Sequence, residues 1–303
     1  MNYTLGESLL DVIFSNMEEV VAKPGGSMLN AAVSMARMGL EVSHISEFGD
    51  NPVAKMLLNF LTKEDINISL IKQYHDTNTS VALAFLDQNK KPSYQFVNAY
   101  PNERSLLPVP EFKTGDLLLF GSIYSISPPI RKALLNYLNS ALAAGCMLFY
   151  DPNMRHKHHL ESKGMMEAVL ENMRLAHIIK ASDEDCFNLF GKGDVKSYFN
   201  KIRSINPNAL IFITLGEHGA EVQFQNMQCR IDALKIQPVS TIGAGDAFNA
   251  GIIKAIVDQR IHRSNLNSIN ETQIITLLSS GTQTAAKVCA SYDNYLPRTN
   301  DAV

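Results

Sequence analysis

Stretches of apolar residues alternate with helix-length segments along much of the chain, and this alternation predicts an α/β protein. Residues 116–121 and 146–150 are apolar runs typical of buried strands, and the segment between them, 129–144, is predicted to be a helix. The run at 210–215 repeats the strand pattern. Strands that alternate with helices favour a mostly parallel sheet, with ligand-binding groups at the carboxyl ends of its strands.

One region has the shorter period of a hairpin. Apolar and polar positions alternate over 79–87 and again over 92–98, on either side of a Gln-Asn-Lys-Lys turn. A hairpin outside the strand–helix alternation predicts a lid over a ligand site. The chain contains no internal repeat, linker or low-complexity tract, so we expect residues 1–303 to form a single domain.

Composition narrows the class of protein. The chain has 303 residues, of which 46% are hydrophobic, enough for a sizeable core. Its formal net charge of −3, with no long basic run, gives no electrostatic reason to expect nucleic acid or a membrane as partner. No apolar stretch has the length of a membrane span or the pattern of a secretory signal. The 4 cysteines are widely separated, which fits reduced thiols and predicts a cytoplasmic protein.

A glycine-rich turn at 243–245 carries a carboxylate, Asp246, to the start of a predicted helix. Apolar residues recur at helical spacing after it, at Phe248, Ile252 and Ile256. The unpaired amides and the dipole of a helix N-terminus favour phosphate, and glycines let a ligand approach the backbone. A carboxylate there would repel phosphate unless it takes a proton from an attacking hydroxyl. The turn therefore predicts phosphoryl transfer with Asp246 as general base.

Two common phosphate-binding motifs do not fit this turn. A P-loop would need Gly-Lys-Ser/Thr where Gly245 and Asp246 stand, and a dinucleotide-binding turn would need glycine or alanine where Phe248 stands. The second mismatch also disfavours a nicotinamide-dependent dehydrogenase. An ordinary tight turn before a core helix stays open as an alternative at this point, because short glycine motifs recur by chance.

Two further segments carry groups that suit a small polar ligand. Gly25 and Gly26 open a predicted helix that ends at Gly39, and Asn30 lies in its first turn, where its amide could bind sugar hydroxyls. Asp11 follows a short N-terminal strand, where α/β proteins commonly place ligand groups. A capped helix with a solvated amide, and a surface carboxylate, are the structural alternatives.

Taken together, four segments resemble the motifs of the PfkB/ribokinase family of carbohydrate kinases, and the resemblance spans nearly the whole chain. Residues 25–39 resemble the first family signature and 241–248 the second. Residues 151–155, Asp-Pro-Asn-Met-Arg, resemble its Asp-Pro-Asn-x-Arg element, and 214–219 resemble its Thr-x-Gly-x-x-Gly nucleotide loop. The resemblance implies a ribokinase-like three-layer α/β sandwich with a mostly parallel central sheet and a small β-sheet lid.

The resemblance also implies an activity, the phosphorylation of a free sugar by ATP with Mg²⁺. The segments at 6–11, 151–155 and 182–185 are similar to fructokinase-like members, so fructose is the preferred substrate. Ribose, 2-keto-3-deoxygluconate or a nucleoside stay open as alternatives, as does a non-catalytic sugar-binding protein, which an intact Asp246 disfavours. Lid segments are expected at about 9–24 and 73–100, and in this family the lid often joins two subunits, which implies a homodimer.

Residue by residue, the resemblance implies three groups of site residues. Those at the reacting atoms are Asp246, an anion hole of Gly243, Ala244 and Gly245, and Arg155. Those that hold the sugar are Asp11, Gly25, Gly26 and Asn30. Those that bind the nucleotide are Ser182, Asp185, Thr214, Gly216, Gly219 and Gln283, with Asp185 also reaching Mg²⁺ through water.

Several positions depart from the family pattern. Ser240 stands where many members carry an aspartate that helps bind a monovalent cation, so the sequence does not support potassium activation. Asp185 is one methylene shorter than the usual glutamate, and Asn51 replaces the aspartate of a Gly-x-Asp element. Three histidines at 156–159 lie among cationic neighbours with no carboxylate or cysteine nearby, which favours a solvated turn over a metal site.

Overall fold

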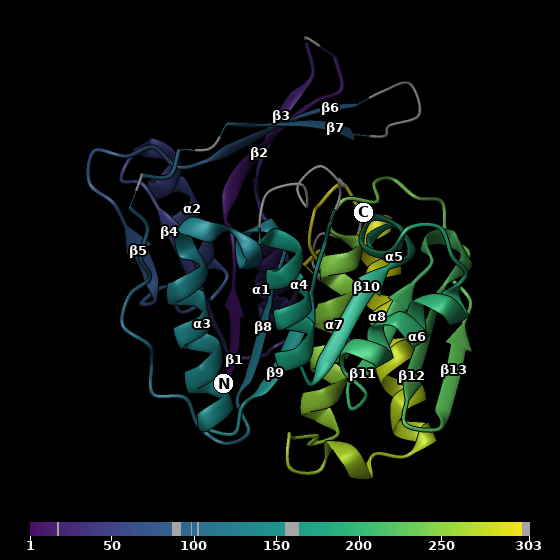
Figure 1. The fold of residues 1–303 in the computed structure, drawn as a ribbon. Helices are drawn as coiled ribbons and strands as arrows, with labels where there is room; N and C mark the ends of the chain where they lie inside the picture. Colours follow the sequence, from purple (N-terminus) through teal and green to yellow (C-terminus); the bar gives the residue numbers. More distant parts are fainter. Residues whose placement is uncertain (17, 87–91, 98, 102, 155–163, 299–303) are drawn as a thin grey trace.

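The larger of two sheets forms the centre of the molecule (Figure 1). The computed structural model describes the chain except residues 17, 87–91, 98, 102, 155–163 and 299–303. Within the described residues the main sheet has nine strands in the order β13-β12-β11-β10-β9-β8-β1-β4-β5. All neighbours are parallel except the pairs that β12 makes with β11 and β13, which confirms the predicted mostly parallel sheet. The strands are β1(Asn2–Leu5), β4(Val42–Phe48), β5(Ile71–Gln73), β8(Leu117–Gly121), β9(Met147–Asp151), β10(Ile178–Ser182), β11(Leu210–Thr214), β12(Ala220–Phe224) and β13(Met227–Ile231).

Helices cover both faces of this sheet. Helices α1, α2, α7 and α8 contribute to the hydrophobic core on one face, and α3, α4, α5 and α6 to the core on the other. The helices are α1(Ser27–Arg37), α2(Pro52–Lys63), α3(Pro128–Ala143), α4(Met165–Leu175), α5(Asp183–Phe190), α6(Val195–Ile205), α7(Ala244–Asp258) and α8(Glu271–Cys289), with short 3-10 turns η1(Ile123–Ile126), η3(Gly216–His218) and η4(Leu266–Ser268).

Strand β8, near the middle of the main sheet, is apolar throughout because both of its faces are buried. In β8, Leu117 and Leu119 point into one core, whereas Leu118 and Phe120 point into the other. All four are at most 3% exposed. A strand covered on both sides reads as a continuous apolar run, and this is the pattern on which the sequence prediction depended.

The predicted elements agree with the structure to within a residue or two. The strands predicted at 116–121, 146–150 and 210–215 are β8, β9 and β11, and the helix predicted at 129–144 is α3. The predicted hairpin is also confirmed, since β6(Val81–Leu86) pairs antiparallel with β7(Pro92–Val97). The turn between these two strands lies outside the described residues.

The second sheet has four strands in the order β3-β2-β6-β7 and stands above the carboxyl ends of the main strands (Figure 1). Its other two strands are β2(Leu9–Phe14) and β3(Val20–Gly25). Cross-strand register places Asp11, Lys23 and Phe96 on one face, which contacts the body of the protein. Phe14 and Phe85 lie on the opposite face, where their rings stack with centroids 5.0 Å apart.

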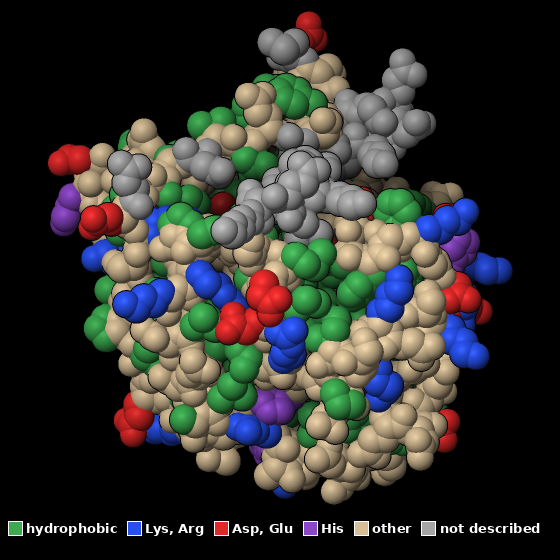
Figure 2. All heavy atoms as spheres, viewed as in Figure 1, with side chains coloured by type: hydrophobic (Ala, Val, Ile, Leu, Met, Phe, Trp, Pro, Cys, Tyr) green, Lys and Arg blue, Asp and Glu red, His purple; other side chains and the backbone are tan. Residues whose placement is uncertain are grey.

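The surface has no single electrostatic character on the face seen in Figure 2, where acidic and basic side chains are interspersed. Among the described helices, none combines the length and the apolar character that a membrane crossing would need. All four cysteines are free thiols, and Cys146 and Cys186 are buried.

His44 on β4 joins this strand to β1 and to the segment between β1 and β2. It is fully buried, and its two ring nitrogens lie 2.7 Å from the hydroxyls of Thr4 and Ser8. Burial lowers the pKa of His44 to about 3, so the ring is neutral in the folded protein at physiological pH. A second histidine, His177, has its pKa lowered to about 4, mainly by burial.

We expect His44 to make the fold sensitive to acid. The unfolded chain protonates this ring near its ordinary pKa of 6.5, whereas the folded protein does so only near pH 3. Stability is therefore complete above pH 6.5 and falls progressively as the pH drops toward 3, by about 2 kcal/mol at pH 5. Urea unfolding at pH 7.5 and pH 5 measures this loss.

The variant His44→Gln removes the titrating ring and keeps a polar side chain. Its free energy of unfolding should be lower at pH 7.5 but should fall less between pH 7.5 and pH 5, because His177 and the carboxyl groups still titrate in it. An equal pH dependence in both proteins would contradict the assignment of this acid sensitivity to His44.

Candidate active site

The turn at 243–245 begins α7, and its two glycines lie where an added side chain would meet neighbouring protein atoms. Gly243 has φ of 79°, and a Cβ on it would lie 1.8 Å from the carbonyl oxygen of Asn294. A Cβ on Gly245 would lie 3.0 Å from Nζ of Lys180. Ala244 is the first residue of the helix. The turn thus presents backbone at a 15-residue helix N-terminus, the site that favours an anion.

Asp246 lies in the first turn of α7 and is held by α1, which packs against α7. Its side chain is buried, with Oδ1 accepting a hydrogen bond from Ser27 Oγ at 2.6 Å and Oδ2 accepting one from Asn30 Nδ2 at 2.9 Å. The side-chain amide of Asn30 is therefore hydrogen-bonded to Asp246, the predicted general base. Its predicted contact with a sugar hydroxyl stays a prediction.

A buried ion pair lies beneath the turn. Lys180 on β10 and Asp151 at the end of the adjacent strand β9 are 3.0 Å apart, Nζ to Oδ2, and both are at most 4% exposed. Asn249, on the second turn of α7, donates to the same Asp151 oxygen at 2.6 Å. The pair and the amide connect the sheet to the helix that carries Asp246.

The electrostatics of this cluster are set by burial and by crowded carboxylates. Burial, with the charges of Asp185 and Asp246, raises the pKa of Asp151 to about 6 against the attraction of Lys180. Burial opposes the charge of Lys180, but the carboxylates of Asp151, Asp185 and Asp246 outweigh it and raise the pKa of the ammonium. Both partners are therefore ionised at neutral pH, and a positive charge lies under the glycine turn.

The predicted sugar-binding residues meet between the two sheets. Asp11 on β2 is 7% exposed and accepts a hydrogen bond from Asn294 Nδ2 at 3.0 Å. A Cβ on Gly25 would lie 2.0 Å from Asp11 Oδ2, and a Cβ on Gly26 would lie 2.3 Å from the carbonyl oxygen of Glu7. Both glycines are thus required by close packing around the carboxylate and the start of α1.

The predicted nucleotide elements lie at the ends of β10 and β11. Ser182 caps α5, and its N–H and hydroxyl each donate to Asp185 Oδ2 at 2.7 Å. Asp185 Oδ1 also accepts the N–H of Met154 at 2.5 Å. Asp185, one methylene shorter than the usual glutamate, therefore accepts hydrogen bonds from the protein with both of its oxygens. Its predicted water-mediated contact with Mg²⁺ stays a prediction.

Thr214 ends β11, and the two glycines of the predicted nucleotide loop flank η3. Gly216 and Gly219 have φ of 56° and 91°, values that favour glycine, and a Cβ on Gly219 would lie 2.0 Å from the carbonyl oxygen of Ile231. Gln283 is exposed on α8 and donates to Ser279 Oγ at 3.0 Å. An open hollow of about 710 Å³ borders this loop at Leu215 and His218.

Arg155 and the histidines at 156–159 lie outside the described residues. Ser240 Oγ accepts the N–H of Ile242 at 3.2 Å, a bond within the turn that does not bear on potassium activation. Among the described residues, no group of three or more His, Cys, Asp or Glu side chains is placed to hold a metal ion.

The sequence motifs missed several side chains at the site, including Asn294. Ser27 follows the glycine pair and carried no separate signal, whereas Asn249 lies one turn after Asp246 in a helix of small residues. Lys180 did carry a signal, because a lysine inside the apolar strand 178–182 is rarely buried unless it is paired.

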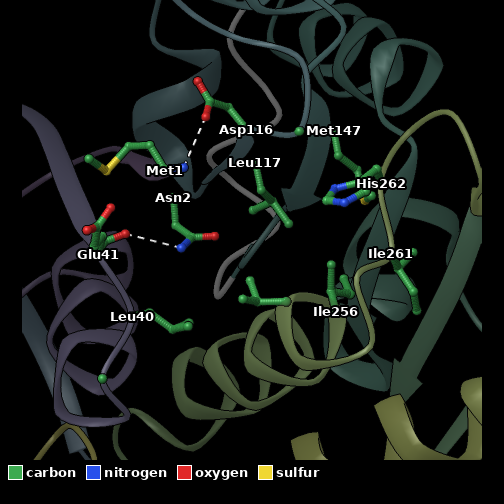
Figure 3. Close-up of a pocket in the computed structure, with 13 residues that line it drawn as sticks. Met1, Asn2, Leu40, Glu41, Asp116, Leu117, Met147, Ile256, Ile261 and His262 are labelled. Carbon is green, nitrogen blue, oxygen red and sulfur yellow. Dashed lines mark hydrogen bonds and ion pairs between the residues drawn. The ribbon is translucent and has the colours of Figure 1, made fainter.

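A second hollow lies at the opposite end of the main sheet (Figure 3). Its volume is about 320 Å³, and its lining includes Asn2, Asp116 and His262 at the amino ends of strands or in nearby loops. The N-terminal amine pairs with Asp116 Oδ1 at 3.0 Å. None of the predicted site residues lines it, so the candidate site is the cluster at the carboxyl ends.

Comparison with known proteins shows which family the chain resembles. The model of the pfkB family of carbohydrate kinases matches residues 4–297. A fructokinase from Vibrio alginolyticus is 25% identical over 257 residues, which are 84% of this chain and 83% of that protein. Probable fructokinase-6, chloroplastic, from Arabidopsis thaliana is 31% identical over 244 residues, 78% of this chain and 62% of that protein.

Solved structures confirm the predicted three-layer fold with its small second sheet. Fructokinase from Vibrio cholerae O395, bound to fructose, ADP and a calcium ion, matches with a TM-score of 0.85 at 21% identity, over 97% of this chain and 94% of that one. A sugar kinase from Pyrococcus horikoshii in complex with ATP matches with a TM-score of 0.81 at 22% identity, over 99% and 96%. Aminoimidazole riboside kinase from Salmonella enterica matches with a TM-score of 0.82 at 20% identity, over 97% and 95%.

The buried ion pair predicts a large effect of removing one charge. Lys180→Met should lower the free energy of unfolding by about 3–5 kcal/mol, because it leaves the Asp151 carboxylate buried without its counter-charge. Adding Asp151→Asn to this variant should recover much of the loss. Urea unfolding of Lys180→Met, of Asp151→Asn and of the double variant measures these differences.

The matched control is Lys254→Met, which breaks the exposed pair that Lys254 makes with Asp258 on α7 at 2.5 Å. A surface pair contributes about 0–1 kcal/mol, so this variant should stay close to the unmodified protein. Equal losses for the two lysine variants would show that burial does not set the strength of the Lys180 pair.

Proposed function

The chain belongs to the pfkB family of carbohydrate kinases and is an ATP-dependent sugar kinase, and on this premise we propose that its acceptor is free fructose. The fructokinases among its relatives support this choice, and so does the Gly-Glu-Ser-Leu-Leu-Asp opening at 6–11. The observation that carries the mechanism is the position of Asp246, a buried carboxylate in the first turn of a helix that begins with two glycines and an alanine.

Asp246 is proposed to act as the general base. A sugar hydroxyl is a weak nucleophile until it loses its proton, and a carboxylate beside the phosphate-binding turn can accept that proton as the hydroxyl attacks the γ-phosphorus. The new bond from the sugar oxygen to phosphorus replaces the bond from phosphorus to the β–γ bridging oxygen, and ADP leaves. The hydrogen bonds from Ser27 and Asn30 fix the orientation of the carboxylate before substrate arrives. This step is worth about 10²–10⁴ in rate in typical enzymes.

The glycine turn and Lys180 are proposed to offset the negative charge of the transferred group. The amides at the start of α7 face the anion, and the ammonium beside Gly245 adds a fixed positive charge where little water enters. Arg155 is proposed as a second cation at the same phosphate. Mg²⁺ would arrive with ATP and neutralise part of the phosphate charge.

The sugar is proposed to bind between the small sheet and the start of α1, held by Asp11, Gly25, Gly26 and Asn30. Asp11 offers acceptors to sugar hydroxyls, and the two glycines leave the backbone within reach of the ligand. A ribosyl compound is the second candidate, because the riboside kinase of Salmonella enterica has this fold. A keto-acid sugar is less favoured, since the sequence offers no evident cationic clamp for a carboxylate.

ATP is proposed to lie across the ends of β10 and β11. Thr214, Gly216 and Gly219 would contact its phosphates and ribose, and the region of α8 around Gln283 would border the adenine. Ser182 and Asp185 cap α5 at this edge, so Mg²⁺ would meet them through water and its first ligands would be phosphate oxygens.

The small sheet is proposed to act as a lid and as a dimer interface. Its inner face carries Asp11, so closure would exclude water from the phosphoryl group. Its outer face exposes three large apolar side chains, Val20, Phe85 and Val97, which are 44–49% exposed. An apolar sheet face of this kind suits burial against a second copy of the chain.

The function is tested by measuring ADP release from Mg-ATP with a panel of free sugars, phosphosugars and nucleosides. Fructose should give the highest kcat/KM. Asp246→Asn should lower kcat by at least about 100-fold, because the amide cannot accept the proton, while calorimetric sugar binding stays within a few-fold of the unmodified protein.

Asp258→Asn is the matched control, since it makes the same chemical change at the other end of α7 on an exposed residue. It should leave kcat unchanged. Equal activity of Asp246→Asn and the unmodified protein would exclude Asp246 as the base, and turnover of another acceptor alone would exclude fructose. Saturable sugar binding without any turnover would favour a sugar-binding protein instead.

The dimer is tested by sedimentation of the unmodified protein and of Phe85→Glu, which places a charge on the outer face of the lid. The unmodified protein should sediment as a dimer and the variant as a monomer. Met56→Glu, at an exposed methionine on α2, is the control and should remain dimeric. A monomeric unmodified protein, or a dimeric Phe85→Glu, would contradict the proposed interface.

A further inference from the structure

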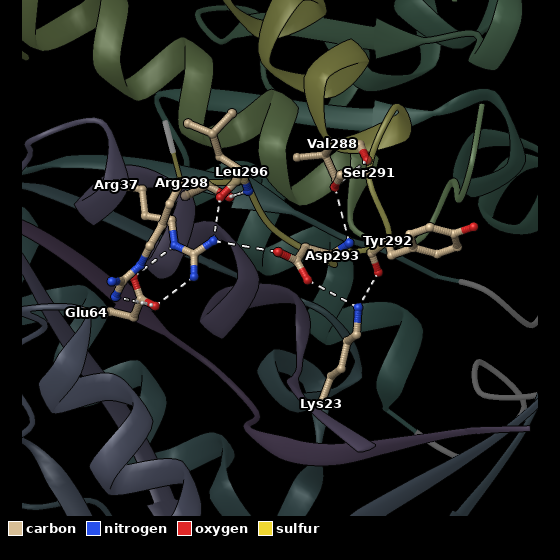
Figure 4. A network of polar contacts seen from close by, with 10 residues as sticks. Lys23, Arg37, Glu64, Val288, Ser291, Tyr292, Asp293, Leu296 and Arg298 are labelled. Atoms are coloured by element: carbon tan, nitrogen blue, oxygen red, sulfur yellow. Dashed lines mark hydrogen bonds and ion pairs between the residues drawn. The ribbon is translucent and has the colours of Figure 1, made fainter. Parts of the chain in front are cut away.

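The segment that follows α8, residues 291–298, crosses between the two sheets and is held on both sides (Figure 4). From β3, Lys23 Nζ donates to the carbonyl oxygen of Tyr292 at 2.5 Å and contacts the carboxylate of Asp293 at 3.2 Å. From α1, Arg37 donates to the carbonyl oxygen of Leu296 at 2.8 Å. The segment therefore has a fixed position relative to the small sheet and to α1, the helix whose Ser27 and Asn30 donate hydrogen bonds to Asp246.

The α1 side of this network is strongly ionic. Arg37 makes two hydrogen bonds to Glu64, at 2.9 and 2.7 Å, and Arg298 adds a third at 3.1 Å. The N–H of Leu296 donates to Ser34 Oγ at 3.0 Å. Several bonds thus anchor the segment beyond Asn294, while Lys23 anchors it before Asn294.

Asn294 lies between these anchors and touches both halves of the candidate site. Its side chain is 1% exposed, and Nδ2 donates to Asp11 Oδ2 at 3.0 Å. Its carbonyl oxygen lies against Gly243, where an added Cβ would be only 1.8 Å away. One residue therefore joins the proposed sugar-binding carboxylate to the proposed phosphate-binding turn.

The direction of this amide is determined by charge. An ionised Asp11 carboxylate accepts hydrogen bonds but cannot donate them. Turning the Asn294 amide over would therefore bring its Oδ1 against a carboxylate oxygen, with no proton between the two. In the observed direction Oδ1 is buried and has no hydrogen-bond partner among the described residues. A buried acceptor without a partner costs free energy, and the protein tolerates this cost at a residue that orients Asp11.

We propose that Asn294 is a positioning residue of the kinase reaction. Through its side chain it orients Asp11 toward the sugar, and through its main chain it sets the distance from that sugar to the glycine turn. In-line attack needs the acceptor hydroxyl and the phosphorus to be held at short, defined separation, so a shift of either half would lower the rate. The inference rests on the proposed function, because it requires Asp11 to bind the acceptor sugar.

The test is a double-mutant cycle with Asp11→Ala, Asn294→Ala and both together, measured as kcat and KM for the sugar and for ATP. Asn294→Ala should raise the KM for the sugar by at least about tenfold and leave the KM for ATP within about twofold. In the Asp11→Ala background the same change should have little further effect, because Asn294 acts through Asp11. Asn294→Asp replaces the donor with an acceptor of the same shape and should raise the sugar KM further.

Asp293→Asn is the control on the same segment, since it weakens the contact with Lys23 without reaching Asp11, and it should leave the sugar KM unchanged. Additive effects in the cycle, or a sugar KM that Asn294→Ala does not change, would overturn the proposal. If Asn294→Ala does not fold, Asn294→Asp takes its place in the same cycle. Turnover of any sugar by the unmodified protein is measured first, and its absence would count against the proposed function rather than against Asn294.

Discussion

Burial of the main sheet on both faces is the constraint on which the rest of the structure depends. Helices cover each face, so a polar side chain on a central strand has no solvent to reach except at the strand ends. Asp151, Ser182 and Thr214 are the last residues of β9, β10 and β11. The same covering that builds the core therefore concentrates the chemical groups along one edge, where the small sheet stands above them.

The charged groups at that edge are buried, so they are stabilised by one another rather than by solvent. Lys180 lies among three carboxylates that raise its pKa, and Asp151 has its own pKa raised by burial. Among the residues that the structure describes, the cluster around the glycine turn holds three carboxylates and one ammonium, those of Asp151, Asp185, Asp246 and Lys180. An arriving phosphate would meet Lys180 already oriented by Asp151, so the protein needs little rearrangement to receive it.

The sequence predicted those parts of the fold and site that depend on local pattern. The strands, the hairpin and the turn before Asp246 are encoded by neighbouring residues, and each lies where the pattern indicates. Lys180 and Asn294 were missed because their importance depends on partners 29 and 283 positions away along the chain. Periodicity also gave no sign that Ser27 would reach Asp246, since that bond requires α1 and α7 to pack together.

The bond between Asp11 and Asn294 has a consequence for how the protein is made. The two residues are separated by 283 positions, so a ribosome synthesises Asp11 near the beginning and Asn294 only after almost all of the sheet. Much of the α/β core can form while translation continues, but the Asp11 carboxylate acquires its partner only once residue 294 has left the exit tunnel. A nascent chain could therefore be folded over most of its length while the small sheet still lacks this bond to the end of the chain.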